Sequence, residues 1–241
     1  MEYSIEIKGL CKDFGAKRAV NELNIKVKTG SLFSILGVNG AGKTTTIRML
    51  TGLTKPTAGD ASVMGCSILT DLDKIKRISS LSPQETSIAP NLTVRENLEF
   101  IAGIYGMDGE KSRLAAGRMI EHFTLKEVEK VKAKTFSGGW QRKVSLAMAL
   151  ITQPQVLYLD EPTLGLDVLA RRSLWKEIEA LKGKITIILT THYMEEAEAL
   201  SDEIAVMAGG NLKAAGTLDE LKKLSQTDTL EDAFVKIVEE M

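Results

Sequence analysis

The chain has 241 residues, 26% of them charged, and its 31 Lys and Arg residues are balanced by 32 Asp and Glu residues. Because nucleic acids are bound largely through an excess of basic groups, this balance argues against a nucleic-acid partner. The two cysteines lack the C-x-x-C spacing and fit a reducing compartment, and no apolar run is long enough to span a bilayer. The first residues also lack the apolar core of a signal peptide, so we expect a cytoplasmic protein.

The first third of the chain shows two kinds of strand pattern. Apolar and polar residues alternate in residues 3–7 and 23–27, as in half-buried antiparallel strands. The nearly continuous apolar run SLFSILG at 31–37 is typical of a strand buried on both faces of a parallel or mixed sheet. We expect a helix from Lys43 to Leu50 and a further strand from Arg77 to Leu81.

The middle of the chain, from Thr93 to about Gln153, has a mostly helical pattern. Thr93 and Glu96 have the spacing of a capping box, in which each side chain accepts the other residue's backbone N–H at a helix start. This region therefore predicts a helical subdomain inserted between two segments of a different architecture.

The last third alternates strands with helices. The apolar runs VLYLD and ITIILT are each followed by a helical stretch, at about 168–181 and 194–200, a rhythm typical of parallel α/β proteins. Two short strands at 203–207 and 211–215, a helix at about 218–224 and an amphipathic ending are expected after them.

Residues 37–44, GVNGAGKT, match the phosphate-binding pattern G-x-x-x-x-G-K-[ST] between a predicted strand and a predicted helix. Glycines let the backbone curl so that N–H groups point inward, while the following helix presents its positive end. We expect Lys43 to neutralise the β and γ phosphates of a nucleotide and Thr44 to ligate Mg²⁺. The predicted binding residues of this loop are Gly37, Val38, Asn39, Gly40, Ala41, Gly42, Lys43, Thr44 and Thr45.

Two adjacent carboxylates follow the buried run VLYL, at Asp160 and Glu161. Asp160 is expected to reach Mg²⁺ at the carboxyl end of its strand, and Glu161 to orient or deprotonate water. Successive strand residues point in opposite directions, so both carboxylates can serve one site only if the strand ends there. Pro162 predicts that ending, because proline cannot continue the ladder of a central strand.

The strands, helices and phosphate loop together predict an α/β fold. We expect a P-loop NTPase core with a mixed or parallel sheet, an N-terminal antiparallel β region and an inserted α-helical subdomain. Residues 1–241 are expected to form one domain, with its core at about 1–84 and 154–224, the helical subdomain at about 85–153 and a C-terminal helix at about 228–241.

The segment FSGGWQRK at 136–143 resembles the signature of the ATP-binding cassette (ABC) family, with Trp140 where that family usually has Gln. Glycines at a helix start are locally costly, which indicates a close approach by another group. The resemblance implies that Ser137, Gly138 and Gly139 bind the γ phosphate of ATP held by a partner subunit. One chain would then contain only half of each site.

Further positions match the family in chain order. The resemblance implies that Gln84 touches Mg²⁺ and the attacking water, and that His192, after the run ITIILTT, hydrogen-bonds the γ phosphate. Asp167 matches a loop that in this family crosses the subunit interface, although Leu164 replaces the usual Ser of that loop. Phe14 falls where an aromatic ring stacks on adenine, and a core position is the alternative interpretation of this residue.

The resemblance implies an ATP-hydrolysing motor subunit of an ABC transporter, with ATP and Mg²⁺ as cofactors. Separate transmembrane permease subunits would place it peripherally on the cytoplasmic face of the membrane, and the C-terminal third resembles single-cassette bacterial exporters. The working pair is either a homodimer or a heterodimer with a related ATP-binding subunit, and the transported substrate is left open. The alternative is a soluble ABC-type ATPase of a non-transport complex, such as an assembly scaffold or a repair protein. Sustained heptads, which a repair ATPase needs, do not occur in this sequence.

Overall fold

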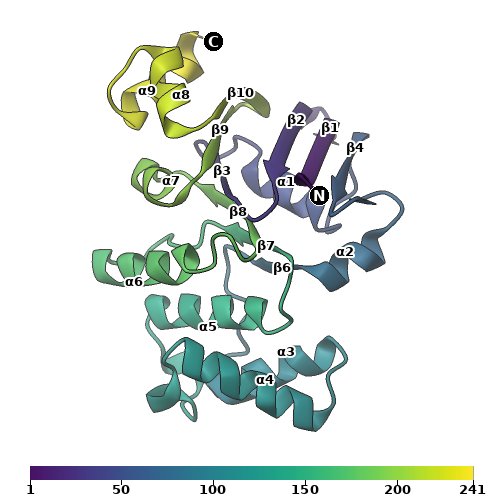
Figure 1. Ribbon diagram of the computed structural model, residues 1–241, viewed down its shortest axis with the longest axis vertical. Helices are drawn as coiled ribbons and strands as arrows, with labels where there is room; N and C mark the ends of the chain where they lie inside the picture. Colours follow the sequence, from purple (N-terminus) through teal and green to yellow (C-terminus); the bar gives the residue numbers. More distant parts are fainter. Residues whose placement is uncertain (241) are drawn as a thin grey trace.

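The computed structural model describes residues 1–240. Two sheets occupy the middle of the molecule, and helices α3, α4 and α5 form one end of it (Figure 1). Helices α8 and α9 lie at the opposite end, beside β9 and β10. Within residues 1–240, every helix is either too short or too polar to cross a lipid bilayer.

The N-terminal sheet is antiparallel, as predicted, and its strands run in the order β2-β1-β4-β5. Ile5 pairs with Val27 and Ile7 with Ile25, so apolar side chains from neighbouring strands share one face. These side chains are buried in a cluster that also contains Ile47 of α1. The strands are β1 (Tyr3–Phe14), β2 (Lys17–Lys28), β4 (Ala58–Val63) and β5 (Cys66–Ser67).

The second sheet has six strands in the order β10-β9-β3-β8-β7-β6. All neighbours are parallel except the edge strand β10, so the predicted mixed sheet is confirmed. Every residue of β3, β7 and β8 is buried, as their continuous apolar runs require. The bounds are β3 (Leu32–Leu36), β6 (Ser79–Ser82), β7 (Val156–Asp160), β8 (Thr186–Thr191), β9 (Glu203–Ala208) and β10 (Asn211–Gly216).

Three helices follow the central strands as the sequence predicts: α1 (Lys43–Leu50), α6 (Val168–Glu179) and α7 (Met194–Leu200). The predicted strand at Arg77 was wrong at its start, because α2 (Leu72–Ile78) occupies Arg77 and β6 begins at Ser79. Strands β4 and β5 were also missed. Helix α2 buries only Ile75, so its sequence carries almost no apolar periodicity from which a helix could be predicted.

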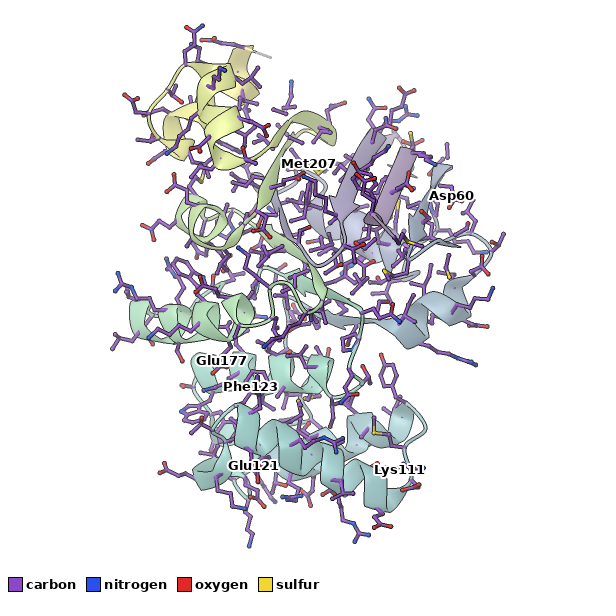
Figure 2. The ribbon with its side chains drawn as sticks, in the orientation of Figure 1. Asp60, Lys111, Glu121, Phe123, Glu177 and Met207 are labelled. Atoms are coloured by element: carbon purple, nitrogen blue, oxygen red, sulfur yellow. The ribbon has the colours of Figure 1, made fainter. Side chains whose placement is uncertain are left out.

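The helical end consists of α3 (Val94–Ile104), α4 (Gly109–His122) and α5 (Gly138–Leu150), with two short 3-10 turns between α4 and α5. The capping box is present: the Thr93 N–H donates to Glu96 Oε2 at 2.8 Å, and the Glu96 N–H donates to Thr93 Oγ1 at 3.2 Å. Phe123, labelled in Figure 2, is buried in a hydrophobic cluster that continues through α5 to the sheet. The helices therefore share a core with β7 and β8.

The C-terminal helices α8 (Leu218–Ser225) and α9 (Leu230–Glu240) pack beside the end of the sheet. Phe234 and Ile237 of α9 are buried against Leu36 of β3 and Ile204 of β9. Helix α9 thus covers the core of its own chain with the apolar face that its periodicity predicts.

Tyr158, in the middle of β7, gives a test of the core. It is completely buried, and within the described part of the chain its hydroxyl has no hydrogen-bond partner. Burial raises the pKa of this phenol, so it stays neutral. An unpaired buried hydroxyl costs about 1–3 kcal/mol. Tyr158→Phe should therefore raise the free energy of unfolding, measured in urea, by about 1 kcal/mol. Tyr105→Phe, at an exposed ring, should leave this free energy unchanged. A lower free energy of unfolding in Tyr158→Phe would contradict the unpaired hydroxyl.

Candidate functional site

The loop between β3 and α1 is shaped by its glycines. Gly40 and Gly42 have φ angles of 84° and 103°, which side chains rarely adopt. A Cβ atom on Gly37 would lie 2.4 Å from the Met207 carbonyl oxygen, and one on Gly42 would lie 2.6 Å from the Ala19 carbonyl oxygen. Met207 is marked in Figure 2. Glycine at 37 and 42 is thus required by the close approach of neighbouring backbone, as well as by the curl of the loop.

Helix α1 begins with free backbone donors. No described side chain caps its start at Gly42, and its first turn carries no acidic residue. Helix α5 begins in the same way at Ser137, whereas α3 and α8 have complete capping boxes. Uncapped N–H groups at the positive end of a helix favour an anion. The two helix starts that the sequence predicts for phosphate binding are therefore chemically open.

Lys43 lies under the loop with only 4% of its surface exposed. Its Nζ donates to the carbonyl oxygens of Gly37, at 2.7 Å, and of Val38, at 3.3 Å. The same Nζ lies 3.2 Å from Glu161 Oε1, so the buried ammonium is paired with a buried carboxylate. Buried charges are stable only with such partners. The Lys43 ammonium is thus held between two carbonyl oxygens of the loop and the Glu161 carboxylate.

Oxygen donors for a hard cation lie beside this lysine. The Thr44 hydroxyl donates to Asp160 Oδ1 at 3.0 Å, and the Thr190 hydroxyl donates to the same oxygen. Hydroxyl and carboxylate oxygens suit Mg²⁺, which protein sites commonly hold by one or two carboxylates together with substrate phosphates. The donor set therefore fits a magnesium ion bound together with phosphate.

Glu161 turns away from β7 through its backbone. Its φ angle is 48°, in the left-handed region, and its N–H donates to the Thr190 carbonyl oxygen at 3.0 Å. This conformation, next to Pro162, ends the alternation of the strand and brings both carboxylates to one edge of the sheet. His192 Nδ1 lies 3.1 Å from Glu161 Oε2. The carboxylate of Glu161 thus lies between the Lys43 ammonium and the His192 ring.

One cavity of about 440 Å³ gathers most of the predicted nucleotide-binding residues. Phe14 lies at its rim with 52% of its surface exposed, so the alternative of a core position was wrong. Gln84 is exposed and lines the same cavity. No local pattern predicts Lys17 or Ala19, which join the lining because β2 lies beside the loop. The lining residues are Phe14, Lys17, Ala19, Asn39, Gly40, Ala41, Gly42, Lys43, Thr44, Thr45, Gln84 and Glu161.

The start of α5 lies in a second cavity, of about 280 Å³, which shares no described lining residue with the first. Ser137, Gly139 and Trp140 line it together with Ala170 of α6. A Cβ atom on Gly139 would lie 2.9 Å from the Ala170 Cβ, so this glycine lets α5 approach α6. Within one chain, the predicted signature is therefore not brought to the phosphate loop.

Asp167 has a structural contact that the resemblance did not indicate. Its carboxylate accepts the backbone N–H groups of Leu169 and Ala170, both at 2.9 Å, and so caps α6. Thr190 was missed as a site residue. Its signal was the pair of hydroxyls, Thr190 and Thr191, that ends the strand after the apolar run IIL and directly precedes His192.

The fold and the loop define a P-loop nucleotide-binding domain. The sequence profile described as ABC transporter matches residues 20–164. Solved structures agree: one described as an ATP-binding subunit of an ABC transporter has a TM-score of 0.86 at 28% identity, covering 97% of this chain and 98% of that one. A dimeric ATP-binding cassette in a post-hydrolysis state, bound to ADP and Pi, has a TM-score of 0.79 at 26% identity, covering 89% and 98%.

Curated proteins show the same relationship. YbhF of Escherichia coli, named a probable multidrug ABC transporter ATP-binding protein, is 39% identical over 98% of this chain and 42% of its own length. The daunorubicin/doxorubicin resistance ATP-binding protein DrrA of Streptomyces peucetius is 40% identical over 91% of this chain and 67% of its own. This chain therefore belongs to the ABC transporter family. It spans less than half the length of YbhF.

The loop geometry predicts different effects for two glycines at positive φ. Gly42→Ala places a Cβ against the Ala19 carbonyl oxygen, whereas Gly40→Ala places one in open space. Gly40→Ala should lower the free energy of unfolding by about 1 kcal/mol, the cost of the left-handed conformation alone. Gly42→Ala should lower it by about 2 kcal/mol or more, because backbone must also shift. Equal losses for the two variants in urea unfolding would contradict the close approach.

Proposed function

We propose that this chain is the ATP-hydrolysing motor subunit of an ABC transporter and drives export through separate membrane subunits. The observation that carries the proposal is the cluster of Lys43, Asp160, Glu161 and His192 around an open helix start. These groups supply an anion site, an oxygen pair for a cation and a carboxylate next to a histidine. Phosphoryl transfer needs little more from a protein than such positioning and charge.

In this proposal, the backbone N–H groups of the loop and of α1 bind the phosphates of ATP. Lys43 exchanges the Glu161 carboxylate for phosphate oxygens, which frees Glu161. Thr44, Asp160 and Gln84 hold Mg²⁺, and the ion neutralises phosphate charge when it is bound. Phe14, at the rim of the cavity, stacks on the adenine ring through its exposed face.

Glu161 is the proposed general base. Once released from Lys43, the Glu161 carboxylate accepts a proton from water. His192 orients this carboxylate and hydrogen-bonds the γ phosphate. The left-handed backbone at Glu161 and its N–H bond to the Thr190 carbonyl oxygen fix the carboxylate in place. Strained backbone held in this way is common where a side chain must be positioned for chemistry.

The separation of the two cavities supports a sandwich of two copies. Ser137 to Gly139 open an uncapped helix but lie outside the phosphate-loop cavity of their own chain. A second copy can bring its α5 start to the phosphates, with Asp167 close to the seam, and the solved relative described as a dimer with ADP and Pi supports this arrangement. The partner is then this chain or a related ATP-binding subunit.

A groove between the sheet and the helical end is the proposed contact with the membrane subunits. It has a volume of about 260 Å³ and includes Leu81, Pro83, Ile101 and Tyr105. The names of relatives support export: drug resistance for DrrA, and Nod factor export for a Rhizobium etli protein that is 39% identical over 90% of this chain and 69% of its own length. We propose that residues 85–153 act as the subdomain that carries this contact at the cytoplasmic face of the membrane.

Glu161→Gln should bind ATP and hydrolyse it at least a hundredfold more slowly, the usual contribution of a general base. The amide no longer competes with phosphate for the Lys43 ammonium. In the presence of ATP and Mg²⁺ the variant should elute as a dimer in size-exclusion chromatography. A chain that stays monomeric, or that keeps its wild-type turnover, would contradict the proposal.

Tyr105→Glu should release the full chain from the membrane fraction of its native cells by at least fivefold, because a carboxylate would enter the apolar groove. Leu114→Glu, at an exposed apolar residue of α4 outside the groove, should not change the membrane fraction. Immunoblots of sedimented membranes measure both. A wild-type chain found only in a non-membrane complex would favour the alternative of a soluble ABC-type ATPase.

A further inference from the structure

Glu196 of α7 is an acidic side chain in an unusual place. It has 0% of its surface exposed, and its two hydrogen-bond donors are uncharged. The Thr163 hydroxyl donates to Glu196 Oε1 at 2.8 Å, and the Trp175 indole N–H donates to the same oxygen at 3.0 Å. The other oxygen, Oε2, has no hydrogen-bond partner among residues 1–240. Acidic residues are almost never fully buried without a specific reason.

The partners of Glu196 come from two other segments. Thr163 lies two residues after Glu161, inside a turn in which the Leu164 N–H donates to the Glu161 carbonyl oxygen at 3.2 Å. The Leu166 N–H in turn donates to the Thr163 carbonyl oxygen at 3.1 Å. Trp175 lies on α6, the helix that follows this turn. One carboxylate oxygen therefore ties α7 to the turn after β7 and to α6.

A second contact joins the same two segments of the chain. His192 Nδ1 lies 3.1 Å from Glu161 Oε2. Glu196 lies four residues after His192, and its partner Thr163 lies two residues after Glu161. The same two segments are thus linked twice, once at the site and once in the buried layer beneath it. The second link has no side chain in the phosphate-loop cavity.

We infer that Glu196 is a positioning residue for ATP hydrolysis, because its buried carboxylate holds the turn of Glu161 and the segment of His192 in their working arrangement through Thr163 and Trp175. The inference rests on the proposed function, in which Glu161 and His192 act together. Glu196 itself does not touch the nucleotide. Its effect is on the geometry of the pair and of the turn that leads to Asp167.

The hydrogen bonds of Glu196 distinguish a residue that positions its neighbours from one that only fills space in the core. The other fully or nearly fully buried residues of α7, Ala197 and Leu200, are apolar, so volume alone does not call for a carboxylate here. Burying an acid is unfavourable, and burial raises the pKa of Glu196. The Thr191 side chain and the Arg171 guanidinium also act on this carboxylate and lower its pKa against the effect of burial. The hydrogen bonds from Thr163 and Trp175 use one acceptor oxygen for two donors. A glutamine carbonyl can supply the same acceptor, whereas a leucine of similar size cannot.

The test compares Glu196→Leu with Glu196→Gln in the purified full chain, with Glu195→Leu as the exposed neighbouring control. We expect Glu196→Leu to lower kcat for ATP with Mg²⁺ at least tenfold while KM stays within twofold. Glu196→Gln should restore kcat to within threefold of wild type, and Glu195→Leu should leave it within twofold. If Glu196 only filled space, leucine, which has a similar size, would keep kcat near the wild-type value.

Thr163 provides a second arm that does not depend on the folding of Glu196→Leu. Thr163→Val keeps the side-chain shape and removes the donor, so kcat should fall at least threefold, and Thr163→Ser should restore it. Combined with Glu196→Leu, Thr163→Val should cause no further loss, because the two act through one hydrogen bond. Additive losses, unchanged kcat in Glu196→Leu and Thr163→Val, or a change in KM alone would overturn the inference.

A measurement without nucleotide separates this inference from the proposed function. Hydrogen–deuterium exchange of residues 161–170 should be at least threefold faster in Glu196→Leu and Thr163→Val than in wild type, and unchanged in Glu196→Gln. Unchanged exchange in all variants would overturn the positioning role even if the wild-type chain hydrolyses ATP. Absence of ATP hydrolysis by the wild type, with this exchange pattern intact, would overturn the proposed function and the role of Glu196 in hydrolysis, and would leave only its structural link to residues 161–170.

Discussion

The parallel pairing of β3, β8 and β7 is the constraint on which the site depends. The register sets Leu36 beside Thr191 and Asp160 beside Thr190, so the carboxyl ends of the three strands lie at one edge. Each strand is followed by a segment that carries polar or charged groups: the phosphate loop, Glu161 and His192. A slip by one residue would move every side chain of a strand to the opposite face of the sheet, where it would no longer match the helices and strands packed there. The packing of the sheet thereby fixes the spacing of the chemical groups.

The charged groups at this edge of the sheet include a buried ion pair between Lys43 and Glu161. Lys43 and Glu161 neutralise each other in the buried layer, at 3.2 Å, and both belong to the set that the proposed reaction uses. A buried ion pair is a weak source of stability. In the proposed function, phosphate takes the place of the carboxylate at the ammonium. The uncapped start of α1 adds a fixed positive potential that needs no rearrangement.

Most of the site could be predicted from the sequence because its chemistry is local. The loop GVNGAGKT and the pair Asp160-Glu161 each carry their residue types within a few positions, next to a strand whose apolar run is plain. Elements without such a run were missed: α2 buries one residue, β5 has only two residues, and β4 has only two buried side chains among its six residues. Lys17 and Ala19 enter the cavity only because β2 lies beside the loop, which no local pattern indicates.

Spacing and periodicity are local properties, so the chemical groups, their order along the chain and the strands that carry them follow from the residues in order. Which of these groups meet depends on the folded arrangement. It joined Glu161 to Lys43 and His192, placed Glu196 beneath them as the acceptor for Thr163 and Trp175, and kept the start of α5 in a separate cavity. Contacts between distant segments depend on how sheets and helices pack, and that packing is a property of the whole chain.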